Sequence, residues 1–322
     1  MKNKVKLYFL SIIISLFYFS PIYSTDQFNF NVTEIEIVDE GNKFIGKKRG
    51  KITTDNNIEI EADEFIYDKS LNTLKLLGNI IIDDIDQDLK IFSEEAIYYK
   101  SKEIFVSKKA SRFIKTDENI RIKAKEFVYE KLTNTLKLIN NVVIEDLNKN
   151  SKIFSNKVIY FKDKELFVSE SDSQFINEEL LIVSNKMEYN KILNSLNASG
   201  NVKIDDKVKN YQIFADDINY LRNTENIFTR GKTKAVIESK YNFNSSDVEL
   251  FRNENLLSSN EKTRILDDDS KLYEIDEFEY NLKSELLKAK NLYIVANNNV
   301  PIGQSDNLKF SDGIFDLKKN TF

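Results

Sequence analysis

The sequence predicts an all-β protein built from stacked repeats of about 31 residues. Three observations support this fold class. Residues 60–84, 122–146 and 182–206 are three variants of one sequence, so the chain repeats itself. Apolar residues within each copy recur mainly at every second position, which is the spacing of a β-strand. Polar segments rich in Asn, Asp and Ser separate the apolar ones, as expected for turns between strands.

The repeat is marked most clearly by tyrosines. They are spaced 31, 31, 31, 29 and 31 residues apart along the middle of the chain. Ile37 extends the series toward the N-terminus, and Phe251, Tyr280 and Phe310 extend it toward the C-terminus with a more degenerate pattern. A period of this size over most of the chain predicts an array of stacked units. The six central markers are Tyr67, Tyr98, Tyr129, Tyr160, Tyr189 and Tyr220.

Each unit is predicted to contain about two strands and two turns. Ile60, Ala62, Phe65 and Tyr67 are two, three and two residues apart, so one extra residue, as in a β-bulge, interrupts the alternation. A second apolar position follows each tyrosine by seven residues, as Leu74 follows Tyr67. Glycine-asparagine pairs at residues 78–79 and 200–201 indicate further bends. When such units stack, equivalent residues form ladders of Ile, Ala or Ser, a mixed apolar residue, and Tyr.

The first 24 residues are expected to be a secretory signal peptide and not part of the fold. Lys2, Lys4 and Lys6 precede a run of 13 residues, 7–19, that is apolar apart from two serines, and Ser24 offers a small residue for cleavage. The run is short for a transmembrane helix, which needs about 20 apolar residues. The remaining residues, 25–322, are expected to form one repeat array, with a possible irregular region at residues 240–270.

Composition narrows the possible chemistry. The chain has 322 residues, no Cys and no His, and a net charge of −5. Thiol catalysis, a Ser-His-Asp triad and zinc sites with Cys or His ligands are therefore impossible. The acidic balance argues against nucleic acid as a partner. We expect no enzyme activity, no catalytic residues, no cofactor and no metal site.

Acidic pairs are the remaining candidates for chemistry. They occur at residues 83–84, 205–206 and 216–217, with a triplet at 267–269. Paired carboxylates could hydrolyse glycosides or bind Ca²⁺. Because the pairs recur at predicted turns of successive units, where Asp is favoured for backbone reasons, we interpret them as solvated turn residues. The alternating lysines and acids on outward strand positions likewise indicate a solvated face.

The repeated motif resembles the OstA-like family. It reads I-x-A-D-x-F-x-Y-x-K followed by N-x-L-x-x-x-G-N-I-x-I-D, and it contains Ile60, Ala62, Asp63, Phe65, Tyr67, Lys69, Asn72, Leu74, Gly78, Asn79, Ile80, Ile82 and Asp83. That family includes the periplasmic lipopolysaccharide-transport protein LptA and the N-terminal part of the outer-membrane subunit LptD. The lead-in at residues 30–50 and the length are more similar to LptD, whose C-terminal barrel is not expected in this chain.

The resemblance implies an open, twisted β-jelly roll of antiparallel strands, also called a β-taco, with an apolar groove. It implies a periplasmic protein at the outer membrane that binds the acyl chains of lipid A and passes lipopolysaccharide along a bridge. The implied partners are an LptA-like protein, joined by edge-strand pairing, and an LptE-like lipoprotein if a barrel follows. Two alternatives are a structural or adhesive exported solenoid without a ligand and, less favoured, a carbohydrate-active solenoid enzyme.

Strand alternation selects the residues expected to line the groove. Each unit contributes its tyrosine and the apolar residue two positions before it, because these two share one face of a strand. The side chains of these residues should face the interior of the stack. The predicted lipid-binding residues are Phe65, Tyr67, Ala96, Tyr98, Phe127, Tyr129, Val158, Tyr160, Met187, Tyr189, Ile218 and Tyr220.

Overall fold

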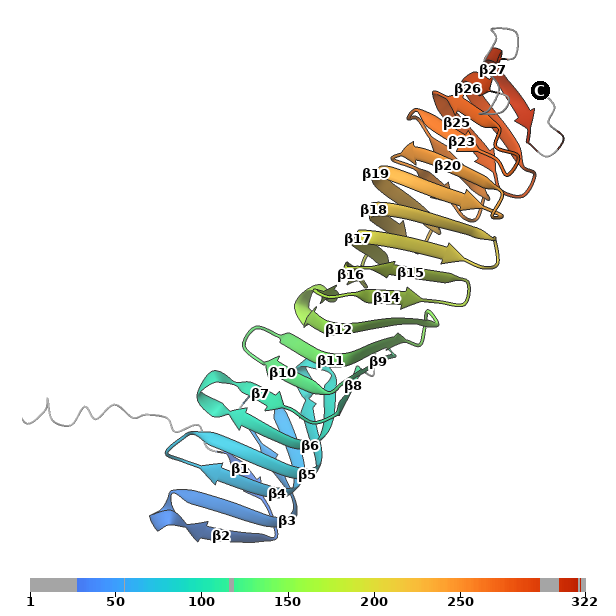
Figure 1. Cartoon of the computed structure of the whole chain (residues 1–322). Coiled ribbons are helices and arrows are strands. Elements are labelled where there is room, and N and C mark those ends of the chain that lie inside the picture. Colours follow the sequence, from blue (N-terminus) through green and yellow to red (C-terminus); the bar gives the residue numbers. More distant parts are fainter. Residues whose placement is uncertain (1–27, 55, 116–118, 296–306, 318, 320–322) are drawn as a thin grey trace, which may run out of the picture.

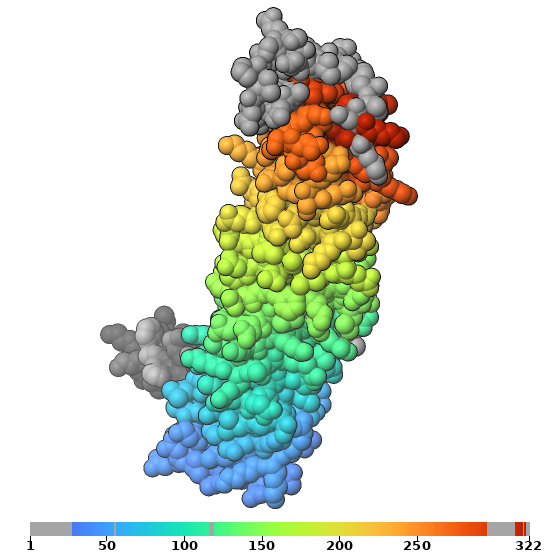
Figure 2. All heavy atoms as spheres, turned by 45° about the vertical axis from the view of Figure 1, so that its right-hand side comes forward, coloured from blue at the N-terminus to red at the C-terminus, as the bar shows by residue number. Residues whose placement is uncertain are grey.

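The computed structural model describes residues 28–54, 56–115, 119–295, 307–317 and 319, which form one antiparallel sheet of 27 strands. The sheet grows from β2 to β27 as an elongated, twisted array (Figure 1). Where two consecutive short strands take the place of one long strand, pairing skips within the group, as β7 pairs with β10 and β8 with β9. In the space-filling view the sequence colours follow each other in bands along the molecule (Figure 2), so residues contact mainly neighbouring units. The expected signal peptide, residues 1–24, lies outside the described residues.

Eleven strands are long and cross the whole width of the sheet. They are β3 (Lys43–Thr53), β4 (Ile58–Asp68), β5 (Thr73–Asp84), β6 (Leu89–Tyr99), β11 (Thr135–Asp146), β12 (Ser151–Phe161), β17 (Ser195–Asp206), β18 (Tyr211–Leu221), β19 (Asn226–Ile237), β26 (Leu286–Val295) and β27 (Asn307–Asp316).

The other strands are short, and most form consecutive pairs that together span the same width, such as β7 with β8. They are β1 (Asn29–Asn31), β2 (Glu34–Val38), β7 (Ile104–Ser107), β8 (Ser111–Lys115), β9 (Ile120–Ala124), β10 (Glu126–Glu130), β13 (Leu166–Ser169), β14 (Ser173–Ile176), β15 (Leu180–Ser184), β16 (Lys186–Asn190), β20 (Tyr241–Ser246), β21 (Glu249–Phe251), β22 (Leu256–Ser259), β23 (Thr263–Leu266), β24 (Leu272–Ile275) and β25 (Glu277–Asn281). Four 3₁₀ turns occur at Asp39–Gly41, Ile85–Gln87, Lys100–Lys102 and Lys162–Lys164.

Nine of the eleven long strands have a register shift near the middle, as the extra residue in the sequence pattern predicts, whereas β26 and β27 pair without one. The register between β4 and β5 shifts between Glu61 and Glu64, and the register between β5 and β6 shifts between Leu77 and Ile80. Gly78 lies at such a bend with φ +72°, a conformation that Gly adopts without steric cost. The bends align from strand to strand, so the sheet is folded lengthwise into a trough with two halves.

We name the halves by their inward residues. The tyrosine half carries Tyr67 and Phe65 on β4, and the isoleucine half carries Ile58 and Ile60 on the same strand. The apex is the line of bends where the halves meet, and the mouth is the line along which their outer rims face each other. Since each half presents alternate side chains inward, both inner faces contribute to one apolar interior.

The interior side chains form continuous ladders along the sheet. Tyr67 pairs with Leu74, Leu74 with Tyr98, and Tyr98 with Phe105. The rings of Tyr98 and Phe105 are stacked with centroids 4.2 Å apart, and those of Tyr160 and Phe167 are stacked at 4.1 Å. Such pairs of neighbouring rings on adjacent strands stabilise the sheet beyond their area of burial.

The weaker markers at the two ends are only partly right. Tyr280 lies in the tyrosine ladder, where it pairs with Leu257 and Leu287. The position predicted for Phe251 is filled by Leu250, which pairs with Ile227. The position predicted for Phe310 is filled by Phe315, which pairs with Leu287. The period drifts because turns differ in length, so counting residues misplaces the marker by one and by five positions.

Small residues fill the apex. Ser93 and Ser107 approach within 3.1 Å through their hydroxyl groups, and Thr229 and Thr233 within 2.6 Å. The same level contains Ala62, which is fully buried. Larger residues of the neighbouring strands, such as Ile80 opposite Ser93, pack against these small residues at the apex. Short strands β20 to β23 continue the sheet through residues 240–270.

Candidate functional site

The predicted groove residues all lie on the inner face of the tyrosine half. Eleven of the twelve are buried, with exposed fractions between 0% and 4%, and Tyr67 is partly buried against them. Phe127, for example, pairs with Leu138 and Ser107 on the neighbouring strands. The alternation therefore places these side chains in the interior as predicted. Whether they contact a lipid stays a prediction.

The twelve residues pack against a second set of apolar residues, which lies on the isoleucine half and was not among the predicted groove residues. Phe113, on the isoleucine half, packs edge-on against Phe127 with ring centroids 5.1 Å apart. Phe175 approaches Tyr220 in the same way at 6.2 Å. The isoleucine half contributes a complete ladder of its own, which includes Ile60, Ile82, Ile91, Phe113, Ile122, Ile144, Ile153, Phe175, Ile182, Ile204 and Ile213. The interior is thus a continuous apolar layer between two walls.

The mouth of this trough is closed by polar side chains. Asp84 ends β5 on the isoleucine rim and accepts a hydrogen bond from the hydroxyl of Tyr129 on the tyrosine rim. Its other carboxylate oxygen lies 2.7 Å from Nζ of Lys131. Asp84 is fully buried. A carboxylate removed from water is stable only when it is paired and hydrogen-bonded, and here both partners come from the opposite rim.

A similar arrangement recurs four levels further along the sheet, where two short strands that lie end to end count as one level. Asp146, which ends β11, accepts a hydrogen bond of 2.9 Å from the hydroxyl of Tyr189. Arg222 donates to that hydroxyl at 2.8 Å and to Oγ of Ser151 at 3.1 Å. Because Asp146 and Ser151 belong to the isoleucine half, these bonds also bridge the mouth. We call these two groups of residues, with the group around Asp206 described next, the latch stations.

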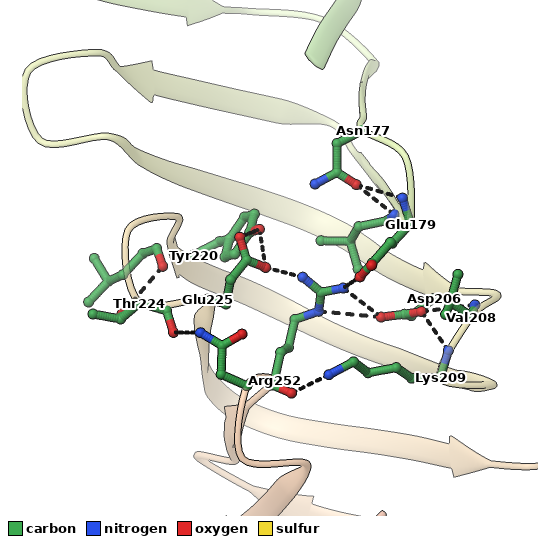
Figure 3. A network of polar contacts seen from close by, with 12 residues as sticks. Asn177, Glu179, Asp206, Val208, Lys209, Tyr220, Thr224, Glu225 and Arg252 are labelled. Atoms are coloured by element: carbon green, nitrogen blue, oxygen red, sulfur yellow. Dashed lines mark hydrogen bonds and ion pairs between the residues drawn. The ribbon is translucent and has the colours of Figure 1, made fainter. Parts of the chain in front are cut away.

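The third latch station is centred on Arg252, just after β21 (Figure 3). Its guanidinium group lies 2.8 Å from Asp206, which ends β17, and 2.8 Å from Glu179, and it also contacts Glu225. Nε donates to the hydroxyl of Tyr211 at 3.0 Å. Arg252 is 3% exposed and Asp206 is fully buried. Three carboxylates around one guanidinium group fix its position and hold the two rims together.

The interpretation of the acidic pairs at residues 83–84 and 205–206 as solvated turn residues is wrong for the second residue of each pair. The second residue of each pair, Asp84 or Asp206, faces inward and is buried in the mouth. The first residue, Asp83, faces outward and forms an ion pair of 2.6 Å with Lys90. The alternation explains the split, since Ile80, Ile82 and Asp84 share one face. That signal was present in the sequence and could have placed these two carboxylates on the inward face. The pair at 216–217 is exposed, as interpreted.

Burial raises the pKa of the Tyr129 hydroxyl well above its usual range, and the nearby charge of Asp84 adds to the increase. Tyr129 is therefore neutral and serves as a donor to the carboxylate. Other tyrosines of the ladder also bond at the rim, as Tyr160 does to Glu165 and Tyr220 to Glu225, both at 2.8 Å. The apolar rings lie inside while their hydroxyls reach the polar boundary.

Two surface hollows lie along the bends and reach inward-facing residues of the sheet. The first, of about 770 Å³, is lined by polar residues such as Glu94 and by the buried Ile80. The second, of about 720 Å³, is lined by polar residues such as Glu188 and by the predicted groove residues Met187 and Ile218. Within the described residues, no cluster of three or more acidic side chains could hold a metal ion, and no helix is long and apolar enough to cross a membrane. The trough and its mouth are therefore the strongest candidate site.

Comparison with known proteins links the centre of the chain to lipopolysaccharide assembly. Residues 111–207 match the family described as lipopolysaccharide-assembly, LptC-related. This segment runs from β8 to the end of β17 and contains Tyr129, Lys131, Asp146 and Tyr189. No curated protein matches the chain in sequence.

Two solved structures show only a remote likeness to the chain. LptH from Pseudomonas aeruginosa, the LptA-homologous periplasmic component of the lipopolysaccharide transport device, is 9% identical with a TM-score of 0.21, over 44% of this chain and 80% of LptH. The TCP10 domain of Danio rerio CPAP, in complex with a STIL peptide, is 8% identical with a TM-score of 0.18, over 87% of this chain and 98% of that domain. Scores this low carry no argument, so the family match supports the relationship to lipopolysaccharide-assembly proteins.

Proposed function

We propose that the chain is a periplasmic component of lipopolysaccharide transport that holds lipid A acyl chains between the two halves of its sheet. The observation that carries this proposal is the continuous apolar interior, which runs through the stacked strands and ends at a polar mouth. An amphiphile fits such a cross-section with its chains inside and its sugars and phosphates outside. The LptC-related match of residues 111–207 supports the choice of lipopolysaccharide.

The expected free energy of binding an acyl chain suits a protein that passes lipid on rather than one that stores it. Burying one CH₂ group contributes about 0.8 kcal/mol, so an acyl chain of about a dozen carbons gains roughly 10 kcal/mol in gross terms. Part of this gain is lost because the lipid and the trough must become ordered. Further cost comes from separating the side chains that already fill the interior, where Phe113 contacts Phe127. The net affinity per site is therefore small enough for the lipid to move on.

The assignment within the transport machinery follows from the sequence resemblance. We infer that the chain acts like the N-terminal part of LptD or like LptA, in the periplasm and associated with the outer membrane. Within the described residues, the outer edges of β2 and β27 pair with no strand, and they would join the chain to an LptA-like neighbour by adding strands to the sheet. An LptE-like lipoprotein becomes a partner if an outer-membrane barrel follows.

A structural solenoid without a ligand is the second candidate. It is favoured by the closed interior, in which residues such as Tyr129 and Phe65 have no exposed surface. In that case the ladders serve only as core, and the latch stations keep the core shut. A carbohydrate-active enzyme is disfavoured because Asp84 and Asp206 are committed to Lys131 and Arg252.

Site-specific photo-crosslinking separates the first two candidates. A photoreactive amino acid replaces Phe127, whose side chain faces the interior, or its neighbour Val128, which faces the other side of the same strand. Each variant is expressed in a periplasm that contains lipopolysaccharide. We expect a lipopolysaccharide adduct at Phe127 and none at Val128. A folded protein without an adduct at Phe127 would support the structural solenoid.

A further inference from the structure

Cations of two kinds lie along the tyrosine rim. Lys131 and Arg252 contact carboxylates directly, at 2.7 Å and 2.8 Å. Lys100, Lys162 and Arg222 form a second row, each two residues after a ladder tyrosine. Among the described residues, no carboxylate forms an ion pair with any member of this second row. We call these three residues the open cations.

The open cations are held by aromatic rings and hydroxyl groups. The Nζ atom of Lys162 lies 5.0 Å from the ring centre of Tyr129 and donates to its hydroxyl at 3.3 Å. Lys100 lies over the ring of Phe28 at 4.5 Å. Such contacts favour a cation but do not bring a negatively charged group into direct contact with it.

Arg222 is held in the same way. It lies over the rings of Phe175 and Tyr189, at 5.1 Å and 5.3 Å, and donates to the hydroxyls of Tyr189 and Ser151. Its link to Asp146 passes through the Tyr189 hydroxyl, just as the link from Lys162 to Asp84 passes through Tyr129. The two groups are therefore equivalent in their bonding.

Lys162 is the most deeply buried of the three open cations. Only 3% of its surface is exposed. Loss of hydration lowers its pKa, Asp84 opposes that effect, and the charges of Lys131 and Lys115 lower the pKa further, to about 8. Buried cations in proteins are normally paired with an anion. A cation kept at the rim of a lipid-sized interior without such a partner marks a place for an anion from outside the chain.

The spacing of the row is regular. Lys100, Lys162 and Arg222 are separated by 62 and 60 residues. These intervals correspond to four strands each, or about 19 Å at a strand separation of about 4.8 Å. Lys162 and Arg222 therefore repeat one arrangement along the mouth, and Lys100 holds the equivalent sequence position one interval earlier, over Phe28.

We propose that Lys100, Lys162 and Arg222 are successive binding stations for the phosphate groups of the amphiphile whose acyl chains occupy the interior. This inference rests on the proposed function, because it places the headgroup at the mouth while the chains lie inside. When the rims part, each open cation becomes accessible and pairs with a phosphate oxygen. The neighbouring Asp84 or Asp146 releases its tyrosine when the rims part, and the bond forms again and closes the mouth after the headgroup has passed.

The test compares lipid A carrying both phosphates with the same lipid after enzymatic dephosphorylation. Binding of each lipid to the full mature chain is measured by equilibrium titration, for the wild type and for Lys162→Met and Arg222→Met. Lys164→Met is the matched control, because it removes the same charge from the same turn at an exposed position. Arg230→Met, exposed at a bend, is the control for Arg222.

We expect the wild type to bind the phosphorylated lipid more tightly, and each test variant to weaken that binding about tenfold, the usual effect of one charge-assisted hydrogen bond. Binding of the dephosphorylated lipid should stay the same, and the two controls should behave as the wild type. Circular dichroism establishes that each variant is folded, and Lys162→Gln replaces Lys162→Met if the latter does not fold.

Three results would overturn the inference. Equal wild-type binding of the two lipids would show that the headgroup is not recognised, while the proposed function would stand. Unchanged affinity in both test variants would place the phosphate elsewhere. Inorganic phosphate that binds in the absence of lipid and competes at the same concentration as lipid A would make free phosphate the ligand. If neither lipid binds the wild type, the proposed function itself fails.

Discussion

Replacing Lys162 by Met should make the protein more stable at neutral pH, although it removes a hydrogen bond. Lys162 is buried, and its pKa falls from 10.5 to about 8 on folding, chiefly because burial penalises the charged form. A shift of this size corresponds to up to about 3 kcal/mol of unfavourable free energy when the lysine is protonated. Met preserves much of the apolar contact with Tyr129 and has no charge to desolvate.

The stability difference between the wild type and the Met variant should depend on pH. Below about pH 8 the lysine is charged in both the folded and the unfolded state, so the wild type carries the full penalty. Between about pH 8 and 10.5 the unfolded state binds more protons, and the free energy of unfolding contributed by this group rises with pH. The charges that face Lys162 and set this window are those of Asp84, Lys131, Lys115 and Asp163. In the Met variant this rise should be absent.

The assay is urea denaturation followed by circular dichroism at pH 7 and at pH 10, with Lys164→Met as the exposed control. We expect Lys162→Met to exceed the wild type at pH 7 by up to about 3 kcal/mol, and the difference to shrink at pH 10. A variant less stable than the wild type at pH 7, or a difference independent of pH, would refute the reasoning. The control should match the wild type within about 0.5 kcal/mol at both values.

Three further variants test other parts of the structure. Arg252→Met should destabilise the fold by about 3–5 kcal/mol, because Asp206 stays buried without its cation, and adding Asp206→Leu should recover much of the loss in the same denaturation assay. Phe167→Ala should cost about 3–5 kcal/mol, since Phe167 stacks on Tyr160 at 4.1 Å, whereas Val168→Ala on the outward face should cost far less. Gly78→Ala should lower the melting temperature more than Gly231→Ala does. Both residues have φ near +72°, but a Cβ at Gly78 would lie 2.7 Å from Asp63 and one at Gly231 would meet no atom within 4 Å.

The fold could be predicted from the sequence because its signals are local and repeated. The spacing of Ile60, Ala62, Phe65 and Tyr67 specifies alternation, a bulge and the inward face at once. Repetition of this pattern shows that units stack, and a stack of bent strands has one interior. The inward direction of Phe127 or Met187 then follows from period alone.

The contacts within the latch stations could not be predicted from the sequence in the same way. Asp84 and Tyr129 are 45 residues apart, and the sequence does not show which rim positions face each other across the mouth. The alternation of Ile82 and Asp84 indicates the direction of the carboxylate but not its partner. Arg252 reaches Asp206, Glu179 and Glu225 only because the twist of the sheet brings three turns together. Such contacts depend on tertiary geometry.

The central claim is that lipid reaches the interior through the mouth, and bridging the mouth tests it most directly. Ile85 and Leu132 are exposed rim residues that directly follow Asp84 and Lys131, which lie on opposite sides of the mouth. The chain has no Cys, so cysteines introduced at these two positions are the only thiols. Bis-maleimides of graded length join the two rims, and a monofunctional maleimide caps the same thiols without joining them.

Uptake of lipopolysaccharide by the bridged and the capped forms of this double variant is then compared. We expect the bridged protein to take up no lipopolysaccharide, because bridging prevents the rims from parting. The capped protein should take it up as the wild type does. Equal uptake by the bridged and capped proteins would contradict the account.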